Sequence, residues 1–128
     1  MAYRVSKSKF ADLVEQALAE LPEQFRTFLE EVPVQIETRP TRALLREMGL
    51  GDRDLLFGLY QGASVMDRVS SEGYGTPRPN HILIFQEDHE LVAKNEQELI
   101  REVRKTVLHE IGHHFGMDED DLDALGYG

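Results

Sequence analysis

Residues 109–119 read HEIGHHFGMDE, and this stretch combines metal-binding residue types at helical spacing. On an α-helix two residues four apart lie within about 40° of each other around the axis. His109 and His113 can therefore grip one metal ion from the same helix face. Glu110, which is not a ligand in such an arrangement, can act as a base on metal-bound water. The segment predicts a catalytic metal site on a helix.

Two imidazoles are too few to hold a zinc ion, so the site requires a third ligand from the protein. Gly116 can adopt a left-handed conformation that turns the chain back toward the metal. An acidic run follows it at once. Asp118 is placed to cap a short last helix, with Asp121 at the third position of that helix. Glu119 is therefore the first choice of ligand, with Asp118 or Asp120 in reserve; the alternative is a solvated capping segment that binds no metal.

The helix that carries the motif is predicted to begin after Asn95, which forms a capping box with Glu98, and to end near Phe115. Its apolar residues fall on one arc about 140° wide, which is typical of a core-facing stripe. His109 and His113 lie nearly opposite this arc and Glu110 lies at its flank. We therefore expect the metal site to open toward a cleft. The residues of the stripe are Ile100, Val103, Val107, Leu108, Ile111 and Phe115.

The rest of the chain predicts alternating helices and strands with no internal repeat and no domain boundary. Ser8 is the expected N-cap of the first helix. The Ser-, Gly- and Pro-rich stretch 61–80 has no periodicity and is expected to line a cleft or to serve as a connector. The predicted helices are 8–21, 23–31 and 41–48; the predicted strands are 32–37, 55–60 and 81–85; and 91–94 is a link.

Composition limits the classes of function that the chain can serve. Its 128 residues suit one domain, 1–128. A formal charge of −10 argues against binding nucleic acid or an anionic membrane surface. No apolar run is long enough to span a bilayer, and the first ten residues lack the apolar core of a signal peptide. The chain has no cysteine, so we expect a cytoplasmic protein without disulfides.

The other histidines have simpler interpretations than the motif pair. His114 lies near the apolar arc and is expected to pack rather than to bind metal. His81 begins a strand and is expected to be ordinary, and His89, which has acidic neighbours, is expected to be solvated. HExxH alone is short enough to occur by accident, but here a glycine and carboxylates follow it at useful spacing.

The motif and its surroundings resemble a known group of enzymes. HExxHxxGxxD is the signature of aspartate zincins, and the strings GLYQG (58–62), PNHILIF (79–85) and VLHEIGHHFGMDEDDLDALGYG (107–128) are similar to the mini-zincins, predicted neutral zinc metallopeptidases. The similarity covers most of residues 10–128. It implies an α+β, minimal zincin-like fold, in which a small twisted mixed sheet packs on helices with a long C-terminal motif helix.

By this resemblance His109 and His113 match the zinc histidines and Glu110 matches the catalytic glutamate. The aspartate position of the family falls on Glu119, which is a departure from the signature. Glutamate has one more methylene and can still reach the ion. The resemblance therefore implies Zn²⁺ as the cofactor and a peptide or protein as the substrate.

The expected activity is hydrolysis of peptide bonds in a shallow cleft, with Glu110 as general base. Tyr74 and Tyr127 are candidate donors to the oxyanion. The substrate is expected to add in extended form to a sheet edge such as 81–85. One alternative is a zinc-binding regulatory or partner-binding protein without efficient peptidase activity. Another is a metal-dependent endoribonuclease, which Glu110 and the negative charge disfavour.

Overall fold

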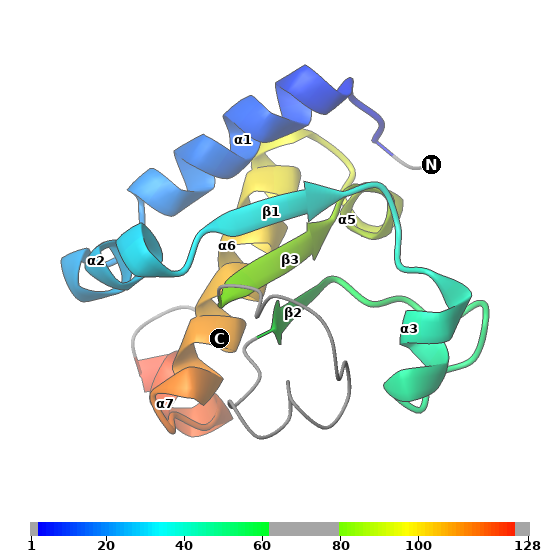
Figure 1. The fold of residues 1–128 in the computed structure, drawn as a ribbon. Helices are drawn as coiled ribbons and strands as arrows, with labels where there is room; N and C mark the ends of the chain where they lie inside the picture. Colours follow the sequence, from blue (N-terminus) through cyan, green and yellow to red (C-terminus); the bar gives the residue numbers. More distant parts are fainter. Residues whose placement is uncertain (1–2, 62–79, 125–128) are drawn as a thin grey trace.

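A computed structural model of the chain describes residues 3–61 and 80–124, and it has the expected α+β architecture. A three-stranded sheet packs against two long helices, with shorter helices around it (Figure 1). The elements in chain order are α1 (Lys7–Ala19), α2 (Glu23–Glu31), β1 (Val34–Glu37), α3 (Arg42–Glu47), β2 (Gly58–Gln61), β3 (His81–Phe85), α5 (Gln86–Val92), α6 (Glu96–His114) and α7 (Glu119–Ala124).

The sheet is mixed, and its strand order is β1-β3-β2. The central strand β3 runs parallel to β1, with Val34 opposite Ile82, and antiparallel to β2, with Tyr60 opposite Ile82. All five residues of β3 are buried, which explains why HILIF is an apolar run rather than an alternating pattern. The strand predicted at 55–60 is shorter and later than expected, because Leu55 is exposed and only residues from Gly58 onward pair with β3.

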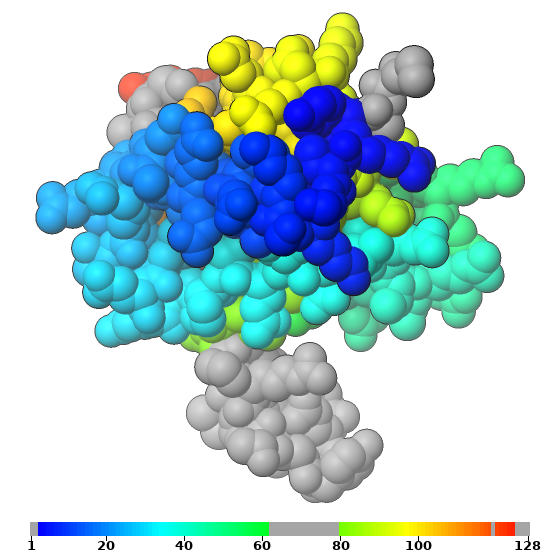
Figure 2. Space-filling view, turned by 90° about the horizontal axis from the view of Figure 1, so that it is seen from above, coloured from blue at the N-terminus to red at the C-terminus, as the bar shows by residue number. Residues whose placement is uncertain are grey.

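Helices α1 and α6 cover one face of the sheet. Figure 1 shows α6 passing behind the strands, and Figure 2 shows α1 between the first turns of α6 and β1. Their apolar stripes meet Ile82 and Ile84 of β3 in one buried cluster. The buried residues of the two helices are Phe10, Leu13, Val14 and Ala17 in α1, and Leu99, Ile100, Val103, Val107, Leu108, Ile111 and Gly112 in α6.

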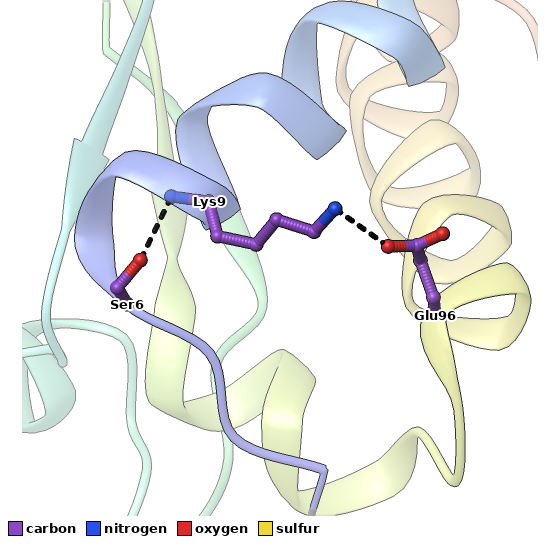
Figure 3. Close-up of polar contacts among 3 residues, drawn as sticks. All are labelled: Ser6, Lys9 and Glu96. Carbon is purple, nitrogen blue, oxygen red and sulfur yellow. Dashed lines mark hydrogen bonds and ion pairs between the residues drawn. The ribbon is translucent and has the colours of Figure 1, made fainter.

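Polar contacts at the start of α1 join it to the first turn of α6 (Figure 3). The N-cap is Ser6 and not Ser8, because the Ser6 hydroxyl accepts a hydrogen bond from the Lys9 main-chain N–H at 3.0 Å. The Lys9 side chain then reaches Glu96 in the first turn of α6, 2.8 Å away. This hydrogen bond and the charge of Glu96 raise the pKa of Lys9. The first turns of α1 and α6 therefore lie side by side.

Helix α5 was missed by the sequence analysis because its buried residues are polar. Gln86, Asp88, His89 and Glu90 are all buried. The Glu90 carboxylate accepts a hydrogen bond from the Val5 main-chain N–H at 2.9 Å, and the Gln86 amide donates to the Val5 carbonyl at 3.1 Å. The helix therefore holds the N-terminal segment with side-chain hydrogen bonds rather than with an apolar stripe.

Helix α6 begins as the sequence predicts. The Asn95 side chain accepts from the Glu98 main-chain N–H at 2.9 Å, while the Glu98 carboxylate accepts from the Lys94 main-chain N–H at 3.1 Å. Its far end departs from the prediction, since Phe115 is 51% exposed and is not part of the core face. Its ring instead packs beside Phe25 and Phe28 of α2. Among the described helices, none has the length and apolar composition that crossing a membrane requires.

Candidate metal centre

The chain reverses direction immediately after the motif helix. Gly116 has φ of 74°, a left-handed conformation that favours glycine. The Met117 main-chain N–H donates to the Gly112 carbonyl at 2.8 Å, and the Gly116 N–H donates to the His113 carbonyl at 3.1 Å. This pair of hydrogen bonds is a Schellman motif, which ends a helix and satisfies its last carbonyls. The turn predicted at Gly116 is confirmed.

Helix α7 packs directly on Gly112 and leaves no room for a side chain there. A Cβ atom at position 112 would lie 2.9 Å from Cδ2 of Leu122, closer than side chains normally approach. Leu122 is fully buried and anchors α7 against α6. A glycine in the middle of a helix costs about 1 kcal/mol relative to alanine, and this close packing offsets that cost. The contact keeps the acidic run beside the motif helix.

Asp118 and Asp121 cap α7 in the way that the sequence predicts. The Asp121 main-chain N–H donates to the Asp118 carboxylate at 2.9 Å, and the Asp118 N–H donates to the Asp121 carboxylate at 3.0 Å. This reciprocal pair satisfies donors that the helix leaves open at its start. One oxygen of Asp118 is thereby engaged, which makes Asp118 less available as a metal ligand.

The third ligand predicted from the sequence remains a prediction. Glu119 is the first residue of α7, and its side chain lies outside the described part of the structure. Among the side chains that the structure describes, no three histidine or carboxylate groups converge as a metal-binding set. Tyr74 and Tyr127, the candidate oxyanion donors, also lie outside the described residues, as do residues 62–79 of the glycine-rich stretch.

The two motif histidines lie on adjacent turns of α6. Their ring centroids are 6.4 Å apart and the ring planes are inclined by 51°. His113 is exposed, whereas His109 is partly buried and its Nε2 atom is shielded from solvent. Zinc binds imidazole nitrogen at about 2.0–2.1 Å, so a shared ion requires the rings to turn toward each other. The donor chemistry and the spacing fit a divalent metal ion of the zinc type.

Glu110 is held by the main chain of the neighbouring strand. Its Oε1 atom accepts a hydrogen bond from the Tyr60 main-chain N–H of β2 at 2.9 Å. The carboxylate is partly buried and is directed toward β2. Sequence reasoning missed this contact, since it joins residues 50 positions apart. The string GLYQG, which contains Tyr60, was the only signal.

Strand β2 approaches α6 closely enough for this bond because residue 58 is glycine. A Cβ atom there would lie 2.5 Å from Cγ2 of Thr106 and 2.9 Å from the Leu83 carbonyl oxygen. Thr106 is one helical turn before Glu110. One turn after Glu110, the His114 ring packs on the Tyr60 ring with centroids 5.2 Å apart. Thr106, Glu110 and His114 therefore form one line of contacts between α6 and β2.

His114 is engaged by aromatic side chains, in keeping with a packing role. Its ring lies 4.8 Å from the Phe28 ring and 5.2 Å from the Tyr60 ring, centroid to centroid. Phe115 adds an edge-on contact at 5.5 Å. These contacts connect α2, the end of α6 and β2, and they stabilise the helix end next to the motif histidines.

The expectation that His89 is solvated is wrong. His89 is fully buried, and its ring bonds to the Phe85 carbonyl and to the Thr106 hydroxyl, each at 2.8 Å. A carbonyl only accepts, so Nδ1 carries the proton and Nε2 of the neutral ring accepts from Thr106. Burial lowers the pKa of His89 to about 4. The acidic neighbours in sequence misled the prediction, because a helix distributes them on different faces.

Among the described strands, the edges of the sheet are β1 and β2, of which β2 is the one that contacts Glu110, and residues 81–85 are not an edge. Strand β3 is central and is paired on both sides, so it has no free edge. The Phe85 N–H bonds to the Phe57 carbonyl, and pairing then alternates along the strand. The main-chain groups of Gly58 and Tyr60 therefore face away from β3, on the side of β2 where Glu110 lies.

An open groove of about 440 Å³ lies on the other face of the sheet. It is bordered by α3 and by strand residues that include Gln35, Glu37, Gln61 and His81. Ile82 and Ile84 point into the core on the α6 side, so their neighbours along β3 point into this groove. The groove borders none of the motif residues, and we assign it no part in the metal centre.

Comparison with known proteins agrees with the expected family and fold. Residues 29–128 match the sequence profile of the family described as zincin-like metallopeptidase. No curated protein matches the chain. A solved structure of a conserved hypothetical protein from T. thermophilus is similar to this fold, with a TM-score of 0.53 and 22% identity over 87% of this chain and 94% of that one.

The profile match spans more than three quarters of the chain and includes the whole motif helix, the turn at Gly116 and α7. The structural similarity supports the fold alone, given its low identity. The chain belongs to the zincin-like metallopeptidase family.

Proposed function

We propose that the protein is a zinc-dependent peptidase that hydrolyses peptide bonds with Glu110 as its general base. One observation carries the proposal. The motif helix carries its histidine pair on adjacent turns, and Glu110 between them binds the Tyr60 main-chain N–H on the side of β2 that faces away from β3. The carboxylate therefore lies where a peptide paired with β2 would pass.

In this proposal His109, His113 and Glu119 hold the metal ion. Imidazole and carboxylate donors without cysteine favour zinc among the common divalent ions. A bound zinc ion would supply Lewis acidity, which polarises a carbonyl group and acidifies water. Asp118 and Asp120 are the alternatives to Glu119.

Glu110 supplies the proton transfers of the reaction. Its carboxylate accepts a proton from the attacking water and later returns it to the leaving amine. Since one oxygen is bound by the Tyr60 N–H, the other oxygen is the atom that exchanges the proton. A residue with this role does not have to bind the metal, so its replacement separates catalysis from metal affinity.

The substrate is proposed to be an extended peptide segment that adds to the free edge of β2. Main-chain hydrogen bonds to an exposed edge are a common way to bind extended peptides without regard to side chains. This corrects the edge expected from the sequence, since residues 81–85 lie in the centre of the sheet. A peptide is also favoured over RNA by the formal charge of −10. The chain has no cysteine, which fits a reducing cytoplasm.

The test is hydrolysis of a peptide library by the zinc-loaded protein, with Glu110→Gln as the matched variant and an RNA mixture as the parallel substrate. We expect peptide cleavage that falls by about 10²–10⁴-fold in the variant. Zinc affinity, measured by competition with a chelator, should be unchanged. Cleavage that persists in Glu110→Gln refutes the assigned base.

Two other outcomes identify the competing functions. Tight zinc binding without hydrolysis of any peptide would indicate a regulatory or partner-binding protein. Cleavage of RNA but not of peptides would indicate a nuclease. A third variant, His109→Ala, should lose zinc affinity and therefore shows whether the measured metal occupies the motif.

A further inference from the structure

The contact between β2 and α6 joins a main-chain N–H of the strand to the carboxylate of the motif. Thr106, Glu110 and His114 are four residues apart, so they face the same side of the helix. Thr106 meets the main chain at Gly58, Glu110 binds the Tyr60 N–H, and His114 packs on the Tyr60 ring. The contacts of Thr106 and His114 hold β2 against α6, and the contact between them joins β2 to the Glu110 carboxylate.

The N–H of Tyr60 is a free-edge donor. Leu59 and Gln61 pair with β3, whereas the main chain of Tyr60 points away from it. Such groups normally face solvent or an added strand. Here Oε1 of Glu110 accepts the bond at 2.9 Å. A hydrogen bond to a charged acceptor is stronger and more directional than one to a neutral acceptor, so it fixes the rotation of the carboxylate.

We propose that the Tyr60 main-chain N–H is the positioning group for Glu110: it holds Oε1 against β2 and leaves Oε2 as the oxygen that transfers protons. The proposal rests on the proposed peptidase function. It goes beyond that function by assigning a positioning role to a peptide group that bears no catalytic side chain. General-base catalysis requires the base to lie within hydrogen-bond reach of its proton, so its rotation matters.

The same contact also determines how an extended substrate meets the strand. A peptide paired with β2 cannot use the Tyr60 N–H, because Glu110 occupies it. Opposite Tyr60, the substrate main chain therefore faces the Glu110 carboxylate instead of a main-chain N–H donor. The substrate peptide group that lies beside Tyr60 is therefore the one next to the base.

Glycine at position 58 is what allows this approach. A side chain there would meet Thr106 and the Leu83 carbonyl oxygen at 2.5 and 2.9 Å. Neither the threonine branch nor the main chain of β3 can move away without shifting α6 or the sheet. We expect Gly58→Ala to move β2 away from α6 and to weaken the Tyr60–Glu110 bond.

The first experiment needs no activity. The Tyr60 amide is followed by NMR in the wild type, in Glu110→Ala and in Glu110→Gln. Alanine removes the acceptor, whereas the glutamine carbonyl oxygen can still accept. We expect hydrogen exchange of the Tyr60 amide to be on the order of tenfold faster in Glu110→Ala, with a smaller change in Glu110→Gln. Equal exchange in the wild type and Glu110→Ala overturns the proposal.

The second experiment removes the donor by replacing the amide between Leu59 and Tyr60 with an ester, which also weakens the Leu59 carbonyl as an acceptor in the pairing with β3. We expect kcat to fall about ten- to hundredfold with KM and zinc affinity unchanged, because the base remains but is no longer oriented. Val14→Ala, in the buried stripe of α1, is the control for lost stability, and it should leave both kcat and the Tyr60 amide unaffected. An unchanged kcat in the ester protein contradicts the positioning role.

The two experiments separate this inference from the proposed function. If the wild type cleaves no peptide, the peptidase proposal fails, and the NMR comparison still decides whether Tyr60 orients Glu110. If the wild type cleaves peptides but exchange at Tyr60 is insensitive to residue 110, the function stands and the positioning role is wrong. If the ester protein does not fold, Gly58→Ala replaces it in the kcat and KM measurement.

Discussion

Gly112 shows how one missing side chain determines the position of a helix. Replacing it with alanine should improve helix propensity by about 1 kcal/mol, yet the new Cβ would collide with Leu122 at 2.9 Å. Overpacking of this kind costs about 1–3 kcal/mol, so we expect Gly112→Ala to lower the free energy of unfolding in urea. In a Leu122→Ala background the collision is absent, and the same substitution should be stabilising. An equal effect in both backgrounds would mean that α7 does not pack on Gly112.

Glu119 is the residue at which the chain departs from the aspartate signature, and its role can be tested against its neighbours. We expect Glu119→Ala to weaken zinc binding by at least about tenfold, measured by chelator competition, because a site with two histidines lacks its third ligand. Asp118→Ala should act mainly on stability, by about 1 kcal/mol, because it removes the cap of α7. A larger loss of zinc affinity in Asp118→Ala or Asp120→Ala would move the ligand to that residue.

Among the helices, strands and turns, those that depend on residues close together in the sequence were predicted correctly. The start of α6 and the turn at Gly116 were predicted correctly because caps and glycine turns depend on residues a few positions apart. Helix α5 was missed because its buried face is polar and has no apolar period. The prediction that residues 81–85 form a free edge was wrong, because β3 is paired on both sides and strand order depends on the whole sheet.

The buried polar face of α5 stabilises the N-terminal segment, and this can be measured at Glu90. Its carboxylate accepts from the Val5 N–H and from the Gln86 amide. Glu90→Ala removes the acceptor of the Val5 N–H and one of the two acceptors of the Gln86 amide, and we expect it to cost about 1–3 kcal/mol of unfolding free energy. Glu87→Ala, on the same helix but half exposed beside Arg39, is the matched control and should cost less than about 0.5 kcal/mol. Similar losses in the two variants would refute the role of Glu90.

At the level of the whole molecule, the candidate site is made where three distant segments meet on α6. The sequence predicted His109, Glu110 and His113 because they share one helix. It predicted the return of α7 from the glycine, but not the Leu122 contact that places it. The docking of β2 on Glu110 was beyond reach, because it depends on a hydrogen bond across 50 positions and on the space that Gly58 leaves. The residue types of the site could be predicted from the sequence, whereas the tertiary contacts that orient them could not.

The core beneath this junction contains a group whose charge affects the stability of the fold. His89 has a folded-state pKa of about 4 against an ordinary value of 6.5, because burial disfavours the charged ring. Between these values the unfolded chain binds a proton that the folded protein does not. The stability that the neutral ring confers is therefore complete above about pH 6.5 and is lost as pH falls toward about 4. Burial raises the pKa of Asp88, so this group lowers the free energy of unfolding as the pH rises, in the opposite direction to His89.

We expect the wild type to lose about 1.4 kcal/mol of unfolding free energy through His89 between about pH 8 and pH 5.5. His89→Phe isolates this contribution, because its aromatic ring can pack beside Phe10 and Phe57, and the Thr106 hydroxyl, released from Nε2, can donate its proton to the Glu102 carbonyl instead. Urea unfolding of both proteins across this range measures the difference. The decline in stability should be shallower in the variant by that amount, while Asp88 contributes equally to both. Parallel curves would show that the His89 ring titrates normally in the folded protein.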